Sequence, residues 1–190
     1  PNVAAYAMPA AADDDRALFD GEGRNVSNGD DEKGVKVFTN GFSVCKFNNF
    51  KTDGSAGHNS LFPDADFFLM RAAEAYLIYA EADARMNGGT TTTDGTQYIN
   101  ALRSRAHATT HTAYSLRQIC DEWSREFYFE GLRRTTLIRF GYFGGNVNYN
   151  WSWKGGVKNG RNFDSHLNLF PIPTSDLVAN EANLIQNPGY

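Results

Sequence analysis

The chain has 190 residues and a formal net charge of −4, and 14% of its residues are aromatic. This length suits one domain that buries a sizeable core, and an acidic chain without a basic stripe argues against nucleic acid as the main partner. The sequence also lacks a run of about 18 uncharged apolar residues, so it predicts no membrane-spanning helix.

The first part of the chain predicts loops followed by one small β-hairpin. Residues 1–33 are rich in Ala, Asp, Gly and Asn and form a loop-rich lead-in. Apolar residues then alternate on both sides of Asn40-Gly41, a dipeptide that favours a type I′ turn. We therefore expect paired strands at Val35–Thr39 and Phe42–Phe47.

A long helix is predicted over Asp64–Arg85. The segment has no Gly or Pro, it begins with acidic residues that favour a helix N-terminus, and Asn87-Gly88-Gly89 follows it. Most of its circumference is Phe, Leu, Met, Tyr, Ile and Ala, so the pattern predicts a helix that is buried on most sides.

A second helix is predicted over Gln97–His107, after a Thr-rich turn. Two helices joined by a short turn form a helical hairpin that resembles one tetratricopeptide-type unit. One such unit cannot cover its own apolar faces, so we expect further helices to pack against it.

The third predicted helix opens with a capping box between Ser115 and Gln118. Apolar residues then recur at amphipathic spacing, at Leu116, Ile119, Cys120, Trp123 and Phe127. Gly131 bends or ends this helix, and residues 132–140 predict a short fourth helix. Residues 141–166 are rich in Gly, Asn and aromatic residues and predict a long loop or hairpin.

Charged residues on the first helix share one arc, and they have possible partners on the helices that follow. The arc carries Arg71, Glu74, Glu81 and Arg85, and the possible partners are Arg103, Arg105, Arg125 and Arg133. Pairing across helices would set the packing register. A glycosidase-like pair of carboxyl groups with separated pKa values is the alternative, but arginines that match the acids keep both ionised and favour the structural interpretation.

No sequence pattern identifies a catalytic, cofactor or metal site. His107 and His111 lie four residues apart, but Ala-Thr-Thr between them weakens a helix and no third ligand is apparent, so we predict no metal site. Phosphate-loop, dinucleotide and nucleophile motifs are absent from the sequence. Cys45 and Cys120 are most simply core residues, with a single bridge between them as the alternative.

Aromatic residues concentrate in the loop 141–166, at Tyr142, Phe143, Tyr149, Trp151 and Trp153. Rings on a polar loop can stack on the flat apolar faces of sugars while Asn side chains bond their hydroxyl groups. The alternative is that the rings only tuck the loop onto the helices. The sequence leaves both interpretations open.

Six segments together resemble, in order and spacing, the carboxy-terminal part of the SusD/RagB family, the surface glycan-binding lipoproteins of glycan-foraging bacteria. They are RAAEAYLIYAEA at 71–82, INALRSRA at 99–106, REFYFEGLR at 125–133, LIRFG at 137–141, LFPIP at 169–173 and QNPGY at 186–190. The resemblance implies a mainly α, SusD-like fold of tetratricopeptide-like helical pairs with a small β-hairpin and long loops. It makes 34–190 the C-terminal domain of a longer protein, and it implies a structural charge network of Arg71, Glu74, Glu81, Arg103, Arg125, Glu130 and Arg133.

The resemblance also implies a function without catalysis or cofactors. Such a protein captures oligo- or polysaccharides at the cell surface for import through a SusC-like TonB-dependent transporter, and a lipid anchor upstream of this region holds it on the outer membrane. Trp151, Trp153 and Tyr149 are the candidate ligand-binding residues. The alternatives are a helical interaction scaffold that docks the transporter without sugar contact, and a glycoside hydrolase. The sequence does not identify the glycan.

Overall fold

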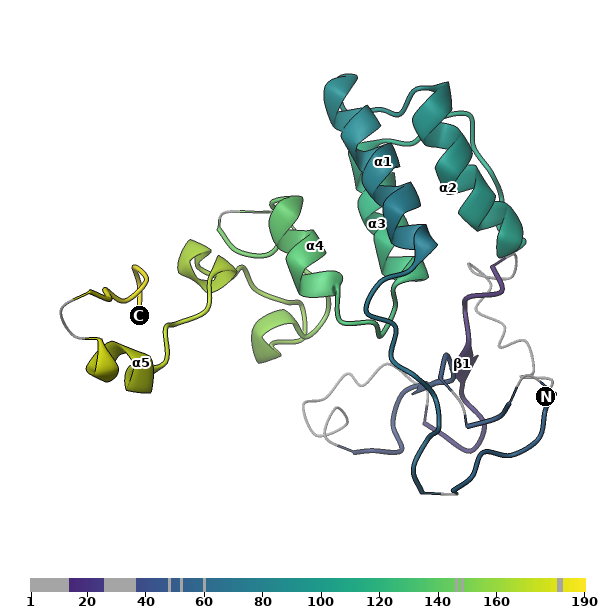
Figure 1. Cartoon of the computed structure of the whole chain (residues 1–190), viewed down its shortest axis with the longest axis horizontal. Helices are drawn as coiled ribbons and strands as arrows, with labels where there is room; N and C mark the ends of the chain where they lie inside the picture. The colour runs from purple at the N-terminus through teal and green to yellow at the C-terminus, as the bar shows by residue number, and fades with distance from the viewer. Residues whose placement is uncertain are drawn as a thin grey trace. The chain divides into compact units, whose positions relative to one another are not determined.

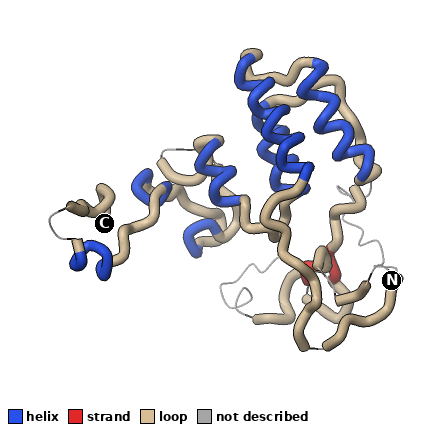
Figure 2. Tube along the Cα trace, in the orientation of Figure 1, coloured by secondary structure: helices blue, strands red, loops and turns tan. Residues whose placement is uncertain are grey.

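The structure is a computed structural model that describes residues 14–25, 37–47, 49–51, 53–59, 61–145, 147, 149–180 and 183–190. The chain divides into two compact units, Pro1–Arg133 and Arg134–Tyr190. The prediction of a mainly helical chain with one small antiparallel sheet is confirmed (Figure 2).

Among the residues of the first unit that the structure describes, the helices are α1 (Ala72–Met86), α2 (Thr93–Arg105) and α3 (Leu116–Glu126). Helix α1 packs against both of the others (Figure 1). Small residues on α1 let the helices approach, and the fully buried core side chains include Leu77 on α1, Ile99 on α2 and Ile119 and Cys120 on α3. The predicted helical hairpin is therefore present as α1 and α2.

The turn between α1 and α2 is held by one carboxylate. Asp83 near the end of α1 accepts hydrogen bonds from the Thr92 backbone N (2.7 Å) and Thr92 Oγ1 (2.8 Å). Thr92 in turn caps α2. The chain approaches so closely here that a Cβ atom on Gly95 would lie 2.2 Å from Asp83 Oδ2, so only glycine fits at this position without a shift.

The predicted capping box of α3 is confirmed. The Ser115 side chain accepts a hydrogen bond from the Gln118 backbone N, and the Gln118 side chain accepts one from the Ser115 backbone N at 2.8 Å. Cys120 of this helix is buried and Cys45 is half-buried, and both are free cysteines.

Two predictions about the first helix are wrong. Helix α1 begins at Ala72, not Asp64, because Arg71 has an extended backbone (φ −148°, ψ 157°) and sends its guanidinium to carboxylates near the end of α3. The helix also buries only one stripe, since the described helices α2 and α3 cover one side of it. Ile78 on the other side is 54% exposed, and Tyr79 is 47% exposed although its ring contacts Tyr98 of α2.

The predicted β-hairpin differs from the structure in its first strand. Strand β2 (Ser43–Val44) lies inside the predicted second strand, but its antiparallel partner is β1 (Phe19–Asp20) from the lead-in. Residues 35 and 36 lie outside the described residues, and residues 37–40 form a turn in which Asn40 N donates to Val37 O. The Phe19 ring packs edge-on against Tyr128 at 5.4 Å, a long-range contact that draws this strand to the helices.

The second unit contains short helical segments joined by loops. They are α4 (Arg133–Arg139, of which only Arg133 lies in the first unit), η3 (Lys154–Gly156), η4 (Ser165–Asn168) and α5 (Thr174–Ala179). The Arg134 guanidinium lies 3.8 Å from the centre of the Phe170 ring and donates to Leu167 O at 2.7 Å. Gln186 pairs with both backbone groups of Ile172, which ties the end of the chain to residues 169–172.

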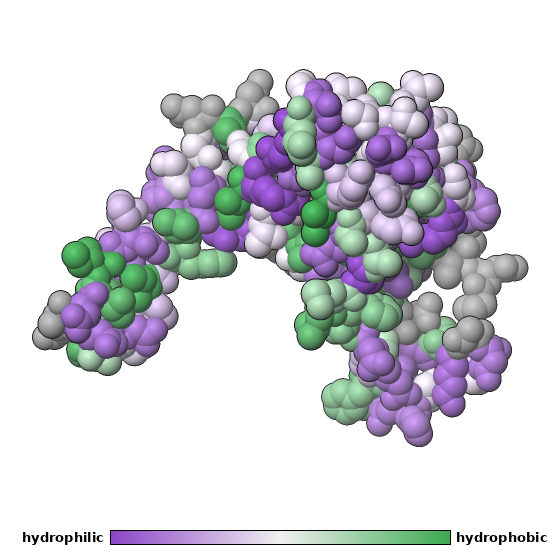
Figure 3. Space-filling view, turned by 45° about the horizontal axis from the view of Figure 1, so that its top comes forward, coloured by the Kyte–Doolittle hydropathy of each residue, from purple (hydrophilic) through white to green (hydrophobic). Residues whose placement is uncertain are grey.

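Apolar residues reach the surface in patches (green in Figure 3). One exposed set lies in the described segment just before α1: Leu61, Phe62, Phe67, Phe68, Leu69 and Met70. Among the described residues, no helix is long and apolar enough to cross a membrane.

Candidate functional site

Three carboxylates at four-residue spacing form the centre of the first unit. Glu122 and Glu126 lie on α3 and are 1% and 2% exposed, and Glu130 follows just beyond the end of the helix. Four-residue spacing places successive side chains on the same face of a helix. Buried carboxylates need charged or hydrogen-bonding partners, and cations from several segments supply them here.

Glu122 is paired with two arginines at close range. Arg103 Nη1 lies 2.7 Å from Glu122 Oε2, and Arg16 Nη1 lies 2.8 Å from Glu122 Oε1. Arg125, one turn further along α3, is 3.2 Å from the same carboxylate. The lead-in, α2 and α3 therefore meet at this side chain.

Glu126 is surrounded by guanidinium groups. Arg105 Nη2 lies 2.7 Å from its carboxylate, Arg16 Nη1 lies 3.0 Å away, and Arg71 forms a further ion pair with it. Burial alone would raise the pKa of Glu126, but the hydrogen bonds from these three arginines lower it to about 2. Glu126 is thus ionised at neutral pH and holds no proton to donate.

Glu130 completes the network through Arg71. Arg71 Nε and Nη2 each lie 2.8 Å from a different oxygen of Glu130, and Lys46 forms a second ion pair with the carboxylate. Burial raises the pKa of Glu130, yet Arg71 and Lys46 leave it below its ordinary value. The Arg71 guanidinium also lies 4.1 Å from the centre of the Phe127 ring.

The predicted charge network is only partly brought together. Arg71, Arg103, Arg125 and Glu130 belong to it, whereas Glu81 pairs with Arg85 on α1 and Glu74 lines a neighbouring pocket. Arg133 donates to the backbone O of Cys120 at 2.9 Å. Arg16, Lys46, Glu122 and Glu126 also belong to the network but were not predicted from the sequence. Of these, only the two glutamates have a signal in the sequence, the four-residue spacing that ends at Glu130.

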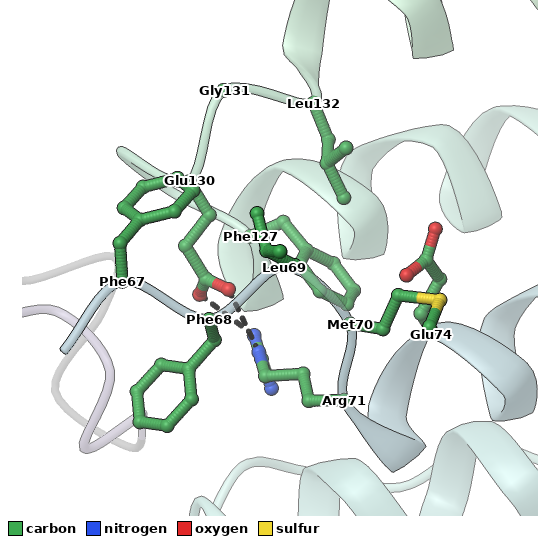
Figure 4. Close-up of a pocket in the computed structure, with 10 residues that line it drawn as sticks. All are labelled: Phe67, Phe68, Leu69, Met70, Arg71, Glu74, Phe127, Glu130, Gly131 and Leu132. Atoms are coloured by element: carbon green, nitrogen blue, oxygen red, sulfur yellow. Dashed lines mark hydrogen bonds and ion pairs between the residues drawn. The ribbon is translucent and has the colours of Figure 1, made fainter.

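A pocket of about 300 Å³ lies beside the Arg71–Glu130 pair (Figure 4). Its wall is mostly apolar, and Figure 4 shows the rings of Phe67, Phe68 and Phe127 around it with Glu74 at one side. Of the two carboxylates at its edge, Glu130 is held in its ionised form by Arg71 and Lys46. The pocket can accept an apolar group, and it offers no proton donor from Glu130.

In the second unit, aromatic rings contact one another in a row. The rings of Tyr142 and Tyr149 stack with their centres 4.9 Å apart and their planes 10° apart. The Trp151 ring meets Tyr149 edge-on, with 6.2 Å between the ring centres, and its centre lies 6.5 Å from that of Phe163. Trp151 is 40% exposed. The rings thus tuck the loop together, while part of one indole stays open to a ligand.

Trp153 is separate from this row among the described residues. Its backbone is left-handed (φ 68°), an unusual conformation for a bulky side chain, and its N donates to Lys158 O at 3.2 Å.

The two histidines considered as metal ligands also have separate surroundings. His107 Nδ1 lies 2.6 Å from Asp15 Oδ2, whereas His111 packs edge-on against Tyr114 at 5.3 Å.

The described helices and the ring-lined loop define a class: a mainly helical protein built on a helical hairpin, with a loop in which aromatic side chains gather. The sequence profile of the SusD family matches residues 15–190, and the chain belongs to this family, whose members are non-catalytic binding proteins. The recognition of a SusD/RagB relationship from sequence motifs is confirmed.

Individual relatives support the same assignment. The chain is 44% identical over 187 residues to the starch-binding protein SusD of Bacteroides thetaiotaomicron. This match covers 96% of this chain and 32% of that protein. It is 29% identical to the SusD-like protein P2 of Formosa agariphila, with 74% of this chain and 29% of the relative covered. The chain therefore spans about a third of the length of these curated relatives.

Solved structures show the same fold. Surface glycan-binding protein A from Bacteroides thetaiotaomicron in complex with laminarihexaose is 27% identical, with a TM-score of 0.50 over 64% of this chain and 24% of that chain. A SusD superfamily protein from Parabacteroides distasonis has a TM-score of 0.57 over 80% of this chain and 32% of that chain, at 24% identity.

Proposed function

We propose that this chain is part of a surface protein that captures glycans and delivers them, chemically unchanged, to a SusC-like TonB-dependent transporter in the outer membrane. The proposal extends to this protein what two relatives bind, starch in one case and laminarihexaose in the other. We further propose that a lipid anchor outside this region holds the protein on the cell surface.

The observation that carries the proposal in this chain is the partial exposure of Trp151, which lies in the ring row between Tyr149 and Phe163. A rigid ring that is fixed on one side and open on the other binds the apolar face of a sugar at low entropic cost. Tyr149 supports Trp151 from within the row, and the loop supplies asparagine side chains for hydroxyl groups. Trp153 is a candidate for a second, independent contact.

A second candidate function rests on the outer face of α1. Tyr79 and Tyr76 pack against Tyr98 of α2 at 4.7 and 5.1 Å, and both are partly exposed next to Ile78. Exposed tyrosines that are fixed by neighbours are typical of protein-binding surfaces. This face favours a scaffold that docks the transporter without touching sugar.

One experiment separates the two functions. Trp151→Ala and Tyr79→Ala are made in the complete protein, and each variant is titrated calorimetrically with maltoheptaose and laminarihexaose and tested for co-purification with its transporter. Glycan capture through the loop predicts that Trp151→Ala lowers glycan affinity about tenfold, since stacking on a ring contributes on the order of 1 kcal/mol or more, while Tyr79→Ala leaves it unchanged.

The opposite pattern would favour the scaffold. Unchanged glycan affinity in Trp151→Ala and in the double variant Trp151→Ala/Trp153→Ala would remove these rings from the glycan site. Loss of transporter co-purification in Tyr79→Ala alone would assign α1 to the protein interface.

A further inference from the structure

Lys154 is a buried lysine in the middle of the aromatic loop. Lys154 as a whole is 1% exposed, although lysine is one of the least often buried residue types. The surrounding backbone holds it on both sides, because Lys154 N donates to Trp151 O at 3.1 Å and Lys154 O accepts from Arg161 N at 3.1 Å. The side chain therefore starts from a fixed point inside the loop.

The ammonium of Lys154 has rings as neighbours. Nζ donates to Tyr149 O at 3.1 Å and lies 4.9 Å from the centre of the Trp151 ring and 5.0 Å from that of Phe163. Burial lowers the pKa of Lys154, and within the described part of the chain no carboxylate forms an ion pair that offsets this effect. The charged ammonium is therefore stabilised by one carbonyl oxygen and by the faces of two aromatic rings.

Glycines allow the loop to close around this side chain. A Cβ atom on Gly160 would lie 2.4 Å from Trp151 O and 3.3 Å from Lys154 Cβ. A Cβ atom on Gly155 would lie 3.1 Å from the Phe163 ring. The backbone thus packs against the same residues that contact the ammonium, which leaves Lys154 little freedom to turn outward.

We infer that Lys154 is a positioning residue that holds the Trp151 ring in the orientation in which its exposed part can stack on a sugar. A methionine would fill the space of the lysine stem about as well, but it has no charge to attract the faces of both rings. The inference rests on the proposed function for the choice of ligand. The orientation of the ring is a separate property and can be measured without any glycan.

The test uses the complete protein labelled with 5-fluorotryptophan and three variants. Lys154→Met removes the charge, Lys154→Arg keeps it, and Lys158→Met changes an exposed lysine in the same loop as a matched control. The fluorine resonance that disappears in Trp151→Phe is assigned to Trp151. We expect this resonance to shift or broaden in Lys154→Met and to stay in place in Lys158→Met, with Lys154→Arg close to the wild type.

Titration with maltoheptaose and laminarihexaose gives the second readout. We expect Lys154→Met to weaken binding three- to tenfold, by less than Trp151→Ala, and Lys158→Met to have no effect. Lys154→Gln, which also removes the charge, is measured in parallel in case Lys154→Met does not fold, and it should shift the Trp151 resonance in the same way.

The outcomes separate the inference from the proposed function. An unchanged Trp151 resonance in Lys154→Met, or in Lys154→Gln if Lys154→Met does not fold, overturns the inference, whatever the glycan affinities are. Wild-type affinity of Lys154→Met beside a weakened Trp151→Ala also overturns it, while the proposed function stands. A shifted resonance with unchanged affinity in Trp151→Ala supports the positioning of the ring and removes the ring from the glycan site.

Discussion

The two units pair their cations in different ways. In the first unit, Arg16, Arg71 and Arg105 converge on a carboxylate of α3, and charge neutralises charge. In the second unit, Lys154 is buried against two rings and a carbonyl that lie within ten residues of it. The first arrangement joins segments that are far apart in the sequence, and the second only closes a loop.

This difference has an energetic consequence. Removing one member of a buried ion network takes away a partner that several opposite charges share, which is strongly destabilising. Removing the lysine leaves rings and one carbonyl, which are neutral. We therefore expect variants of the network to affect the folding of the helical unit, and variants of the lysine cluster to affect mainly the loop.

The largest expected effect is that of Glu126→Gln. The substitution keeps the shape of the side chain but leaves three guanidinium groups without their shared charge, and we expect a loss of about 3–5 kcal/mol in the free energy of unfolding. Urea unfolding of the complete protein, followed by far-ultraviolet circular dichroism, measures it. Asp121→Asn is the matched control on the same helix, because Asp121 forms a partly exposed pair with Arg117 (3.7 Å) that contributes at most about 1 kcal/mol. Equal effects of the two variants would contradict this interpretation of the network.

Acid should weaken the helical unit through the same residue. The pKa of Glu126 is about 2 in the folded protein against an ordinary value of 4.5, so the unfolded chain binds the proton first as the pH falls. Its contribution, on the order of 3 kcal/mol, is complete above about pH 4.5 and is lost as the pH falls toward 2. Unfolding free energies measured at a series of pH values between about 6 and 3 should fall less steeply in Glu126→Gln.

The pKa of Lys154 is lowered as well, so its effect on stability has the same sign as that of Glu126, but its ordinary value of 10.5 lies far above the acid range, and the lysine therefore serves as the control for the acid experiment. Because the folded protein lowers the pKa of Lys154, the unfolded chain binds this proton more tightly, and its effect on stability becomes more favourable as the pH rises. Lys154→Met should therefore keep the acid dependence of the wild type. If the unfolding free energy of Lys154→Met fell less steeply with acid than that of the wild type, the assignment of the acid dependence to Glu126 would be wrong.

The smallest expected effect is on the stability of the loop, and a comparison of alanine substitutions at two of its glycines measures it. Gly156 and Gly160 both have left-handed backbones (φ 79° and 72°), but a Cβ atom on Gly156 meets nothing within 4 Å, whereas one on Gly160 meets Trp151 O. Both alanine variants carry the cost of the conformation, about 1 kcal/mol, and Gly160→Ala adds the clash. We expect Gly160→Ala to be the less stable by about 1–2 kcal/mol and to shift the Trp151 fluorine resonance. Identical behaviour of the two variants would argue against close packing at Gly160.

Local patterns predicted the second, third and fourth helices well. The capping box at Ser115 and the apolar spacing after it are properties of adjacent residues, and α3 forms where they indicate. The predicted helix Gln97–His107 overlaps α2 with its start four residues late, because Thr92 caps the helix while Asp83 of α1 holds Thr92 in place. The conformation of the cap depends on a contact that the local sequence does not reveal.

The start of α1 and the partner of β2 were decided by tertiary contacts. Residues 64–70 have helical propensity, yet Arg71 takes an extended backbone as it reaches Glu126 and Glu130. Propensity contributes fractions of a kcal/mol per residue, which buried ion pairs and ring contacts exceed. The same holds for β2, which pairs with a strand of the lead-in and not with its neighbour in the sequence.

The sequence by itself determined the family, the helical hairpin and the aromatic character of the loop, because each depends on residues that are close together along the chain. Only the tertiary structure decided which carboxylates share which arginines, that Lys154 is buried between rings, and that Trp151 rather than Trp153 belongs to the ring row. These features depend on which distant side chains come together, and the local sequence is compatible with many paths of the backbone. Packing selects one of those paths, because buried charges must find partners.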